Sequence, residues 1–465
     1  MRSTLWWQKN TMLCERNLSM SLNLDKTEKN EHLYMQIYHY YRNLILEHKL
    51  LPGSKMPSLR KCARELKLSR TTIENAYLQL AADGYIISKA QSGYYVTNIA
   101  ARQTPIQSPG ITRQPACRYD FASSGADRES FRFDLWRRYI KSAFRQDERL
   151  LSYGEPQGEA DFRQVLSEYI RERRNILCSP DDIVVGAGVQ SLLHILCPLL
   201  KDKNTVSFPT PSFVQGSTVF RDYGFDVRYR NKDSGVIYVS PAHMTKWGDI
   251  MPISRRLELI RYAAEHNSLI IEDDFENEFV YLQKPTPSLH SLAGGQGIVY
   301  IGSFSRLLLP SIRISFMVLP EPLKSAYLQK AACYNQTASK AEQIALCQFI
   351  RDGHLAAQTR KLKRLYSVKL KKLLTTVEDI FGRDSRIQIG DAGTSLALTL
   401  PVSLTGKELK EKTREQGLRI QTLKETPGEV TVILSCSSMP AEDFPPACRI
   451  LHEVCSRYPV QGAYS

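Results

Sequence analysis

Apolar residues in the first hundred positions follow the spacing of three helices. Between 33 and 45 they recur every three or four residues, which predicts an amphipathic helix. A second, short helix is expected from about 57 to 66. A third should begin at Ser69, a good capping residue, and end before Gly84, with apolar side chains at 73, 76, 77 and 80 on one face.

Two β-prone runs, 85–87 and 94–96, follow the third helix and are separated by a polar stretch that contains Gly93. They predict a β-hairpin. Three helices and a hairpin in this order form a winged helix-turn-helix, and we assign residues 31–98 to it. Residues 1–30 lack helical periodicity and are treated as an N-terminal extension.

The remaining sequence changes character twice. Residues 99–118 contain three prolines, one glycine and no periodicity, which predicts a linker. From 119 to 465, helical segments alternate with apolar runs that suit buried strands, among them 183–185, 236–239, 268–271 and 298–301. This alternation predicts an α/β domain with a mainly parallel sheet.

Composition is that of a folded protein and excludes a disordered or fibrous one: 42% of the 465 residues are hydrophobic and 24% are charged. No apolar run approaches the roughly 20 residues of a transmembrane helix, and the N-terminus lacks a signal-peptide core. We expect a cytoplasmic protein without a membrane partner. The net charge of +14 is concentrated at the front, where residues 1–98 hold 14 basic and 8 acidic side chains, a net +6.

The ten cysteines include no C-x-x-C pair. The nearest approach to a metal cluster is Cys448, His452 and Cys455, which would share one helix face, but no fourth ligand stands close by. We expect reduced, mostly buried thiols and no metal site.

The start of the third predicted helix carries the residue types that read DNA. In a helix-turn-helix this end enters the major groove, where hydroxyl, amide and guanidinium groups meet phosphates and base edges. Arg70 would contact DNA there, and Arg60 on the preceding helix is a second candidate. Gly93 at the wing tip would let the backbone approach the minor groove. Glu74 faces the same groove and would either accept from a cytosine amino group or be a misfit. The predicted DNA-contact set is Ser58, Arg60, Ser69, Arg70, Thr71, Thr72 and Gly93.

An arginine at a helix start is often only a solvated charge. Here it belongs to an ordered run of motifs, Leu51-Pro52-Gly53, Met56-Pro57-Ser58-Leu59-Arg60, Ser69-Arg70-Thr71-Thr72, Asp83-Gly84-Tyr85 and Ser92-Gly93. This run closely resembles the GntR family of bacterial winged-helix regulators. The resemblance implies that Arg60, Arg70, Thr71 and Gly93 meet DNA.

Six motifs of the second domain resemble fold-type I aminotransferases as they occur fused to GntR heads in the MocR-like subgroup. They stand in the family's order: Tyr153-Gly154-Glu155-Pro156-Gln157-Gly158, Gly186-Ala187-Gly188-Val189-Gln190, Pro209-Thr210-Pro211-Ser212-Phe213, Ser240-Pro241-Ala242-His243, Glu272-Asp273-Asp274-Phe275, and Ser303-Phe304-Ser305 with Pro310 and Arg313. With the head, the resemblance covers about residues 31–460 and implies a fold-type I aminotransferase-like domain.

In that family the domain holds pyridoxal phosphate, and several of the implied ligands are present. The turn Gly188-Val189-Gln190 leads into an apolar helix expected over 192–200, whose amides and positive dipole end would face the phosphate. Ser303, Ser305 and Arg313 would complete the phosphate cup. Asp273, at the end of a predicted strand, would pair with a protonated pyridine nitrogen, although an ordinary strand-end carboxylate is the alternative.

Other implied groups are missing. The family's Schiff-base lysine falls on Arg306, and a guanidinium with a pKa above about 12 stays protonated and has no lone pair with which to attack an aldehyde. We therefore expect no catalytic residue and no transamination, unless Arg306 is merely a surface residue. Phe213 and Phe275 stand where the family commonly has tyrosines, and Ile433 stands where it places an arginine for the substrate carboxylate. Lys246 lies near the implied site, but a rescuing Schiff base there is not expected.

We interpret the chain as a bacterial DNA-binding transcriptional regulator, nucleoid-associated when bound to an operator. Its aminotransferase-like domain would be a dimer platform and a sensor of a small anionic ligand, without turnover. A second reading keeps pyridoxal phosphate or pyridoxamine phosphate (PLP or PMP) as a non-covalent effector, and a third is an active aminotransferase with a DNA-binding appendage. The sequence leaves open the operator, the effector, activation or repression, and an exchange of heads between partner subunits.

Overall fold

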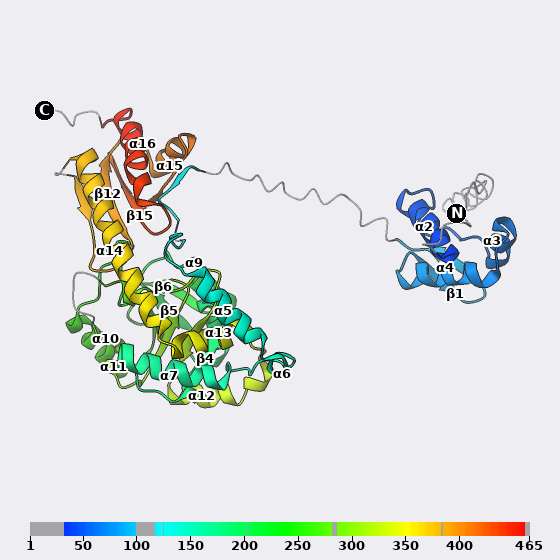
Figure 1. Cartoon of the computed structure of the whole chain (residues 1–465), viewed down its shortest axis with the longest axis horizontal. Helices are drawn as coiled ribbons and strands as arrows, with labels where there is room; N and C mark the ends of the chain where they lie inside the picture. Colours follow the sequence, from blue (N-terminus) through cyan, green and yellow to red (C-terminus); the bar gives the residue numbers. More distant parts are fainter. Residues whose placement is uncertain are drawn as a thin grey trace. The chain divides into compact units, whose positions relative to one another are not determined.

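The computed structural model describes residues 32–98, 117–123, 125–200, 202–280, 286–382 and 385–460. The chain divides into two compact units, Met1–Gln114 and Pro115–Ser465 (Figure 1). The predicted N-terminal extension and all but the last two residues of the predicted linker lie outside the described residues. The domain boundaries therefore stay predictions, although the division falls within the segment 99–118.

Over residues 32–98, the first unit contains three helices and a hairpin. The helices are α2 (Leu33–Leu46), α3 (Leu59–Leu66) and α4 (Arg70–Ala82), and the antiparallel strands are β1 (Ile86–Lys89) and β2 (Gly93–Val96). Their core includes Tyr41 and Tyr77, which meet edge to face at 5.6 Å and are fully buried. Both strands are longer than the apolar runs that predicted them, because the ladder continues from Ser88 and Lys89 to Gly93 and Tyr94. The hairpin loop is correspondingly shorter than predicted.

A seven-stranded sheet forms the centre of the second unit. Its strands are β4 (Ile183–Gly186), β5 (Thr205–Phe208), β6 (Asp226–Tyr229), β7 (Val236–Val239), β8 (Leu269–Asp273), β9 (Ile298–Ser303) and β10 (Ser315–Val318). Their order is β4-β10-β9-β8-β7-β5-β6. Only β10 is antiparallel to its neighbours β4 and β9. The mainly parallel α/β sheet predicted from the sequence is thus confirmed.

Helices cover both faces of this sheet, because its strands are apolar on both sides. Ile183 and Val185 of β4 belong to one core and Val184 to the other. The helices that pack on the first face are α5 (Phe133–Phe144), α7 (Ala160–Arg174), α13 (Lys340–Arg351), α14 (His354–Phe381), α10 (Ile253–Glu265) and α11 (Leu289–Leu292); those on the second are α8 (Val189–Leu196), α9 (Val214–Asp222) and α12 (Glu321–Leu328). The helix expected over 192–200 is α8, which begins and ends earlier, and a single 3₁₀ turn continues it.

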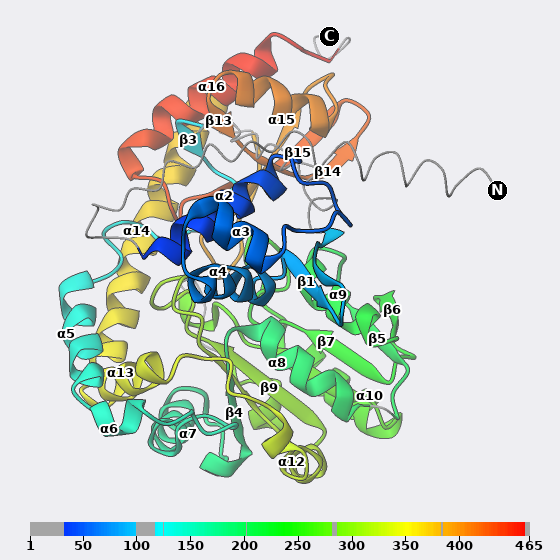
Figure 2. The ribbon, with the colours of Figure 1, turned by 90° about the vertical axis from the view of Figure 1, so that its right-hand side faces the viewer.

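The long helix α14 leads from the large sheet to a smaller C-terminal layer (Figure 1). There β11 (Arg386–Gln388), β12 (Ser395–Pro401), β15 (Glu429–Ser435) and β14 (Gln421–Thr426) form an antiparallel sheet in this order. The helices α15 (Gly406–Glu415) and α16 (Phe444–Ser456) belong to this layer. The short strand β3 (Tyr119–Asp120) pairs in parallel with β13 (Leu418–Arg419), so the start of the unit is fixed to its C-terminal layer (Figure 2).

The structure also bears on two further features considered from the sequence, a metal cluster on one helix and a membrane-spanning helix. On α16, Cys448 and Cys455 are buried whereas His452 is exposed, so the three do not converge on one point. Among the described residues, no helix combines the length and the apolar character needed to cross a bilayer.

Candidate functional site

The strand register gathers the predicted ligand-site residues at one edge of the large sheet. At the start of β10, Ser315 pairs with Gly186 at the end of β4 and with Ser303 at the end of β9. On the next strand Asp273 pairs with Ile301 of β9. The carboxyl ends of parallel strands meet at this edge, which is where open α/β sheets bind ligands.

Asp273 is buried and only half satisfied. Its Oδ2 accepts a hydrogen bond of 2.5 Å from the Tyr238 hydroxyl, while its Oδ1 is buried and has no hydrogen-bond partner among the described residues. Burial raises the pKa of Asp273 to about 6; the hydrogen bond from Tyr238 acts in the opposite direction. One oxygen of this carboxylate is therefore left without a donor from the described residues.

Aromatic rings lie around Tyr238, the hydrogen-bond donor to Asp273, and beside Phe275. The ring of Tyr238 stacks on Phe208 at 4.9 Å between centroids and lies 5.4 Å from Phe213. Phe213 in turn covers Gly216, where a Cβ would come within 2.2 Å of the phenyl ring. Only a glycine at 216 allows Phe213 to take this position. Phe275, directly after the strand that carries Asp273, lies 5.0 Å from the ring of His243.

A glycine and an arginine form a cradle at the start of α8. Gly188 has a φ of +91°, and a Cβ there would lie 2.4 Å from Nη2 of Arg313. The guanidinium thus rests against the backbone that leads into the helix, where free N–H groups and the helix dipole favour an anion. Arg313 and Gln190 are exposed and Val189 is half-buried.

Three hydroxyls continue this cradle along the edge of the sheet. Ser315 donates to Ser303 at 3.0 Å, and Ser303 donates to Ser305 at 3.4 Å. Ser315 is fully buried, whereas Ser303 and Ser305 are half-buried. The sequence predicted the latter two and missed Ser315, which becomes visible only through the antiparallel register of β10.

Arg306 forms an ion pair with Glu276, from Nη2 to Oε1. The Glu276 side chain is 2% exposed, and its Oε2 lies 3.2 Å from Nδ1 of His243. Burial alone would raise the pKa of Glu276, but the charges of Arg306 and His243 outweigh it and hold the pKa below its ordinary value. Glu276 also has a φ of +61°, which is uncommon for a non-glycine residue. This strained backbone conformation sets the direction of its side chain.

This pairing corrects one alternative from the sequence. Arg306 is 27% exposed and held by a buried carboxylate, so it is not a freely solvated surface arginine. Its charge is also matched by Glu276, which the sequence gave no reason to single out. Arg313, by contrast, forms no ion pair with a carboxylate of the described residues, so it is the predicted cation of the site whose charge is left for a ligand.

Two other residues considered from the sequence lie apart from these contacts. Lys246 is half-buried, and burial lowers the pKa of its amine. Ile433 is 4% exposed and stands inside β15, opposite Ala397. Thr337, which the sequence missed, accepts a hydrogen bond of 2.9 Å from the N–H of Ala187 and so fixes the turn before Gly188.

In the head, two of the predicted DNA-contact hydroxyls also cap helices. Ser58 accepts from the N–H of Lys61 at the start of α3, and Ser69 accepts from the N–H of Thr72 at the start of α4. Thr72 also shares a hydrogen bond of 2.7 Å with Ser69 between their hydroxyls. The Ser69 cap therefore fixes the start of α4, where Arg70 lies.

The charged and small residues of the predicted interface are solvent-exposed. Arg60, Arg70, Thr71 and Gly93 are exposed, and Glu74 is half-buried. Gly93 has a φ of +102°. Two cations that the sequence did not single out lie beside Tyr95 of the wing. The amines of Lys89, in β1, and Lys55, which precedes α3 and bridges to β2, are 4.5 and 5.9 Å from the ring centre of Tyr95.

Comparison with known proteins divides the chain at the same place. A family model described as bacterial regulatory proteins, gntR family, matches residues 33–96, and one described as aminotransferase class I and II matches residues 130–422. The chain is 33% identical over 410 residues to YdeL of Bacillus subtilis, an uncharacterized HTH-type transcriptional regulator, covering 83% of this chain and 88% of that protein. It is 26% identical over 426 residues to the probable rhizopine catabolism regulatory protein MocR of Rhizobium meliloti, covering 84% and 86%.

Solved structures agree on the fold of the second unit. An archaeal alanine:glyoxylate aminotransferase superposes with a TM-score of 0.66 at 18% identity, over 76% of this chain and 92% of that one. The kynurenine aminotransferase of Pyrococcus horikoshii gives 0.63 at 19% identity, over 73% and 90%. These matches confirm the predicted aminotransferase-like fold of the second unit, and the gntR-family match confirms the predicted helix-turn-helix head.

Proposed function

Because the chain belongs to the gntR family of bacterial regulatory proteins, in its branch of HTH-type transcriptional regulators fused to an aminotransferase class I and II domain, we propose that its second unit senses a small phosphorylated anion and performs no transamination. The head binds operator DNA, and the ligand at the sheet edge changes that binding. The supporting observation is that residue 306, where the family resemblance implies a Schiff-base lysine, is an arginine in an ion pair with Glu276.

The head recognises DNA through the start of α4. Arg70 and Thr71 are exposed at a helix end that Ser69 caps, so they can reach phosphates and base edges without losing a structural contact. Gly93 and the two lysines beside Tyr95 approach the neighbouring minor groove. The hydroxyls of Ser58 and Ser69 already cap helices, and that of Thr72 is hydrogen-bonded to Ser69, so the main role of these three residues is to position the backbone.

The ligand's anionic group binds at the cradle of Gly188 and Arg313. A phosphate is the best match, because backbone N–H groups, a guanidinium and the hydroxyls of Ser303 and Ser305 are donors suited to its several oxygens. A carboxylate would leave some of these donors unused. Arg306 contributes less, since its charge is already balanced by Glu276.

PLP or PMP, bound without a covalent bond, is a second candidate that a specific observation favours. The free Oδ1 of Asp273 fits a protonated ring nitrogen, and Tyr238 and Phe213 offer aromatic surface beside it. In aminotransferases this cofactor supplies an electron sink for reactions at the amino group of a substrate. Here Asp273 would hold the ring nitrogen's proton and Arg313 the phosphate, while Arg306 offers no free amine.

The absorption spectrum and the intact mass of the purified full-length protein test this function. After incubation with PLP and treatment with borohydride, we expect no covalent adduct by mass spectrometry. Thermal shift should show stabilisation by PLP and by PMP, and much less by pyridoxal, which lacks the phosphate. A covalent adduct, or amino-group exchange with a keto acid, would establish the rival function of an active aminotransferase and overturn ours.

A homodimer completes the proposal. Leu151 and Tyr153, which follow α6 (Asp147–Leu150), are 88% and 100% exposed, although large apolar side chains are normally sheltered. A second copy would cover them and present two heads to paired operator half-sites. Sedimentation velocity should find a dimer for the full chain and a weakened one for Leu151→Glu.

A further inference from the structure

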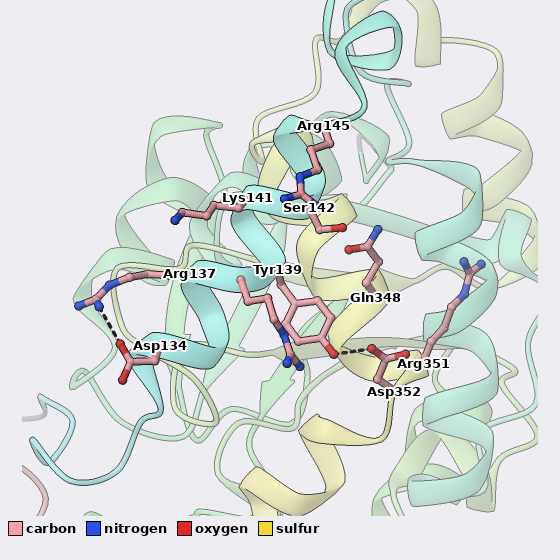
Figure 3. A pocket seen from close by; sticks show the side chains of 10 residues that line it. Asp134, Arg137, Tyr139, Lys141, Ser142, Arg145, Gln348, Arg351 and Asp352 are labelled. Atoms are coloured by element: carbon pink, nitrogen blue, oxygen red, sulfur yellow. Dashed lines mark hydrogen bonds and ion pairs between the residues drawn. The ribbon is translucent and has the colours of Figure 1, made fainter.

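A cationic groove lies on the surface of the second unit, formed by α5 and α13. Its volume is about 760 Å³, and it is lined by Asp134, Arg137, Arg138, Tyr139, Lys141, Ser142, Arg145, Gln348, Arg351 and Asp352 (Figure 3). Five of these side chains are basic and two are acidic, a formal net charge of +3. None of them belongs to the predicted ligand site at the sheet edge, which is formed by other elements.

The basic residues of this groove follow one face of α5. Arg137, Lys141 and Arg145 are four residues apart, so each lies about 6 Å further along the helix than the last. Arg138 is the next residue after Arg137 on α5. Arg351, the last residue of α13, lies on the other side of Tyr139 from Arg137 and Lys141 (Figure 3). All five basic side chains are exposed.

The groove's two carboxylates neutralise little of this charge. Asp134 binds Arg137 at 2.7 Å in a pair whose side chains are 96% and 70% exposed, a weak arrangement in water. Asp352 accepts a hydrogen bond from the Tyr139 hydroxyl. Among the described residues, Arg138, Lys141, Arg145 and Arg351 form no ion pair within 4 Å.

The buried side of α5 fixes the groove in place, and Tyr139 belongs both to this side and to the groove lining. Trp136 and Tyr139 are buried and meet Phe349 of α13 edge to face, at 5.8 and 5.5 Å. Because this packing locks the two helices together, the row of cations is held as a preformed surface. Its lining has only one aromatic ring and no aliphatic side chain, unlike the apolar lining of most small-molecule sites.

We propose that this groove binds the phosphate backbone of duplex DNA, as a second contact beyond the winged helix-turn-helix. The row from Arg137 to Arg145 spans about 12 Å, and each strand of the duplex presents a phosphate every 3.4 Å along its axis. The row can therefore follow one strand over several nucleotides. Such contacts carry no base information, so the groove strengthens binding to any sequence.

The salt dependence of DNA binding tests this proposal in the full-length protein. Fluorescence anisotropy with a mixed-sequence 40-base-pair duplex would be recorded from 50 to 200 mM salt. Each lost phosphate contact lowers the slope of log K against log[salt] by about 0.9, so Lys141→Gln with Arg145→Gln should lower it by about 2. Across that salt range, this makes the variant's loss of affinity about tenfold smaller than that of the wild type.

The matched control is Lys407→Gln with Lys410→Gln, which removes two exposed charges from α15 in the C-terminal layer. It should leave the slope close to that of the wild type. An unchanged slope in the groove variant, or an equal change in the control, would overturn the proposal. So would loss of the dimer in the groove variant by sedimentation velocity, or loss of a thermal shift with pyrophosphate while the DNA slope stays the same.

Discussion

Arg306 and Glu276 form an ion pair in which the carboxylate is almost completely buried and the guanidinium is not. Glu276 is held there by a left-handed backbone conformation and by His243 on its other oxygen. A buried carboxylate without a cation would be costly, so residue 306 has a structural duty independent of any chemistry on a ligand. Arginine neutralises the Glu276 carboxylate with a permanently charged group, whereas a lysine could neutralise it and could also lose its proton.

Replacement of Arg306 by lysine should restore covalent capture of PLP. The lysine amine can still pair with Glu276, while Asp273, Ser303, Ser305 and Arg313 remain in place to hold the cofactor. We expect an absorption band above 400 nm that disappears on borohydride treatment and leaves a stable mass adduct. Arg306→Gln, which has neither charge nor a nucleophile, is the control and should give no adduct. If the lysine variant also gives none, the site does not orient PLP as we propose.

Replacement of Arg306 by methionine should destabilise the protein in a pH-dependent way. The pair lowers the pKa of Glu276, so its contribution is present above the unfolded pKa of about 4.5 and is lost as pH falls through the lower folded value. At pH 7 we expect a loss of about 3 kcal/mol in the free energy of unfolding, near the lower end for one partner of a buried pair. Urea titrations at pH 7 and pH 4 measure it, and an equal loss at both would contradict the argument.

These residues also show how far the sequence could lead. Ser69, Gly84 and the helical spacing of 73, 76, 77 and 80 predicted α4 because caps and apolar faces are local properties. The roles of Asp273 and Arg313 rested on motifs in a fixed order, and the sheet register brings these motifs to one edge. The Arg306 to Glu276 pair joins positions 30 residues apart through a strained turn, and Ser315 enters the site through an antiparallel strand. Neither leaves a periodic or compositional signal.

Replacement of Asp273 by asparagine should make the ligand-free protein more stable at neutral pH. Burial raises the pKa of Asp273 from 3.8 to about 6, so the folded state binds more protons than the unfolded state between these values. Stability therefore falls as pH rises through this window, by about 3 kcal/mol for two pKa units. The Asp273→Asn variant has no carboxyl group at this position, so its unfolding free energy does not fall in this way. The difference in unfolding free energy between variant and wild type should grow in favour of asparagine from pH 4 to pH 7.

The same variant should bind PLP more weakly. Asparagine cannot offer a negative charge to a protonated ring nitrogen, and loss of a charge-assisted hydrogen bond costs about 1.5 to 3 kcal/mol, or roughly ten- to a hundredfold in affinity. Titration calorimetry would measure it. The control is inorganic phosphate, whose binding at Arg313 should be unaffected. Equal affinity of both proteins for PLP would show that Asp273 does not meet the ring, while leaving the phosphate cradle intact.

In the head, two neighbouring variants should separate stability from DNA recognition. Ser69→Ala removes the cap of α4 and should lower the unfolding free energy of the head by about 1 kcal/mol. The exposed Arg70 side chain makes no hydrogen bond or ion pair with the described residues, so the stability of Arg70→Gln should stay within about 0.5 kcal/mol of the wild type. Its affinity for DNA should nevertheless fall. Anisotropy with the same 40-base-pair duplex and thermal unfolding of each full-length variant measure the two effects, and a destabilised Arg70→Gln with unchanged DNA affinity would contradict the role of Arg70.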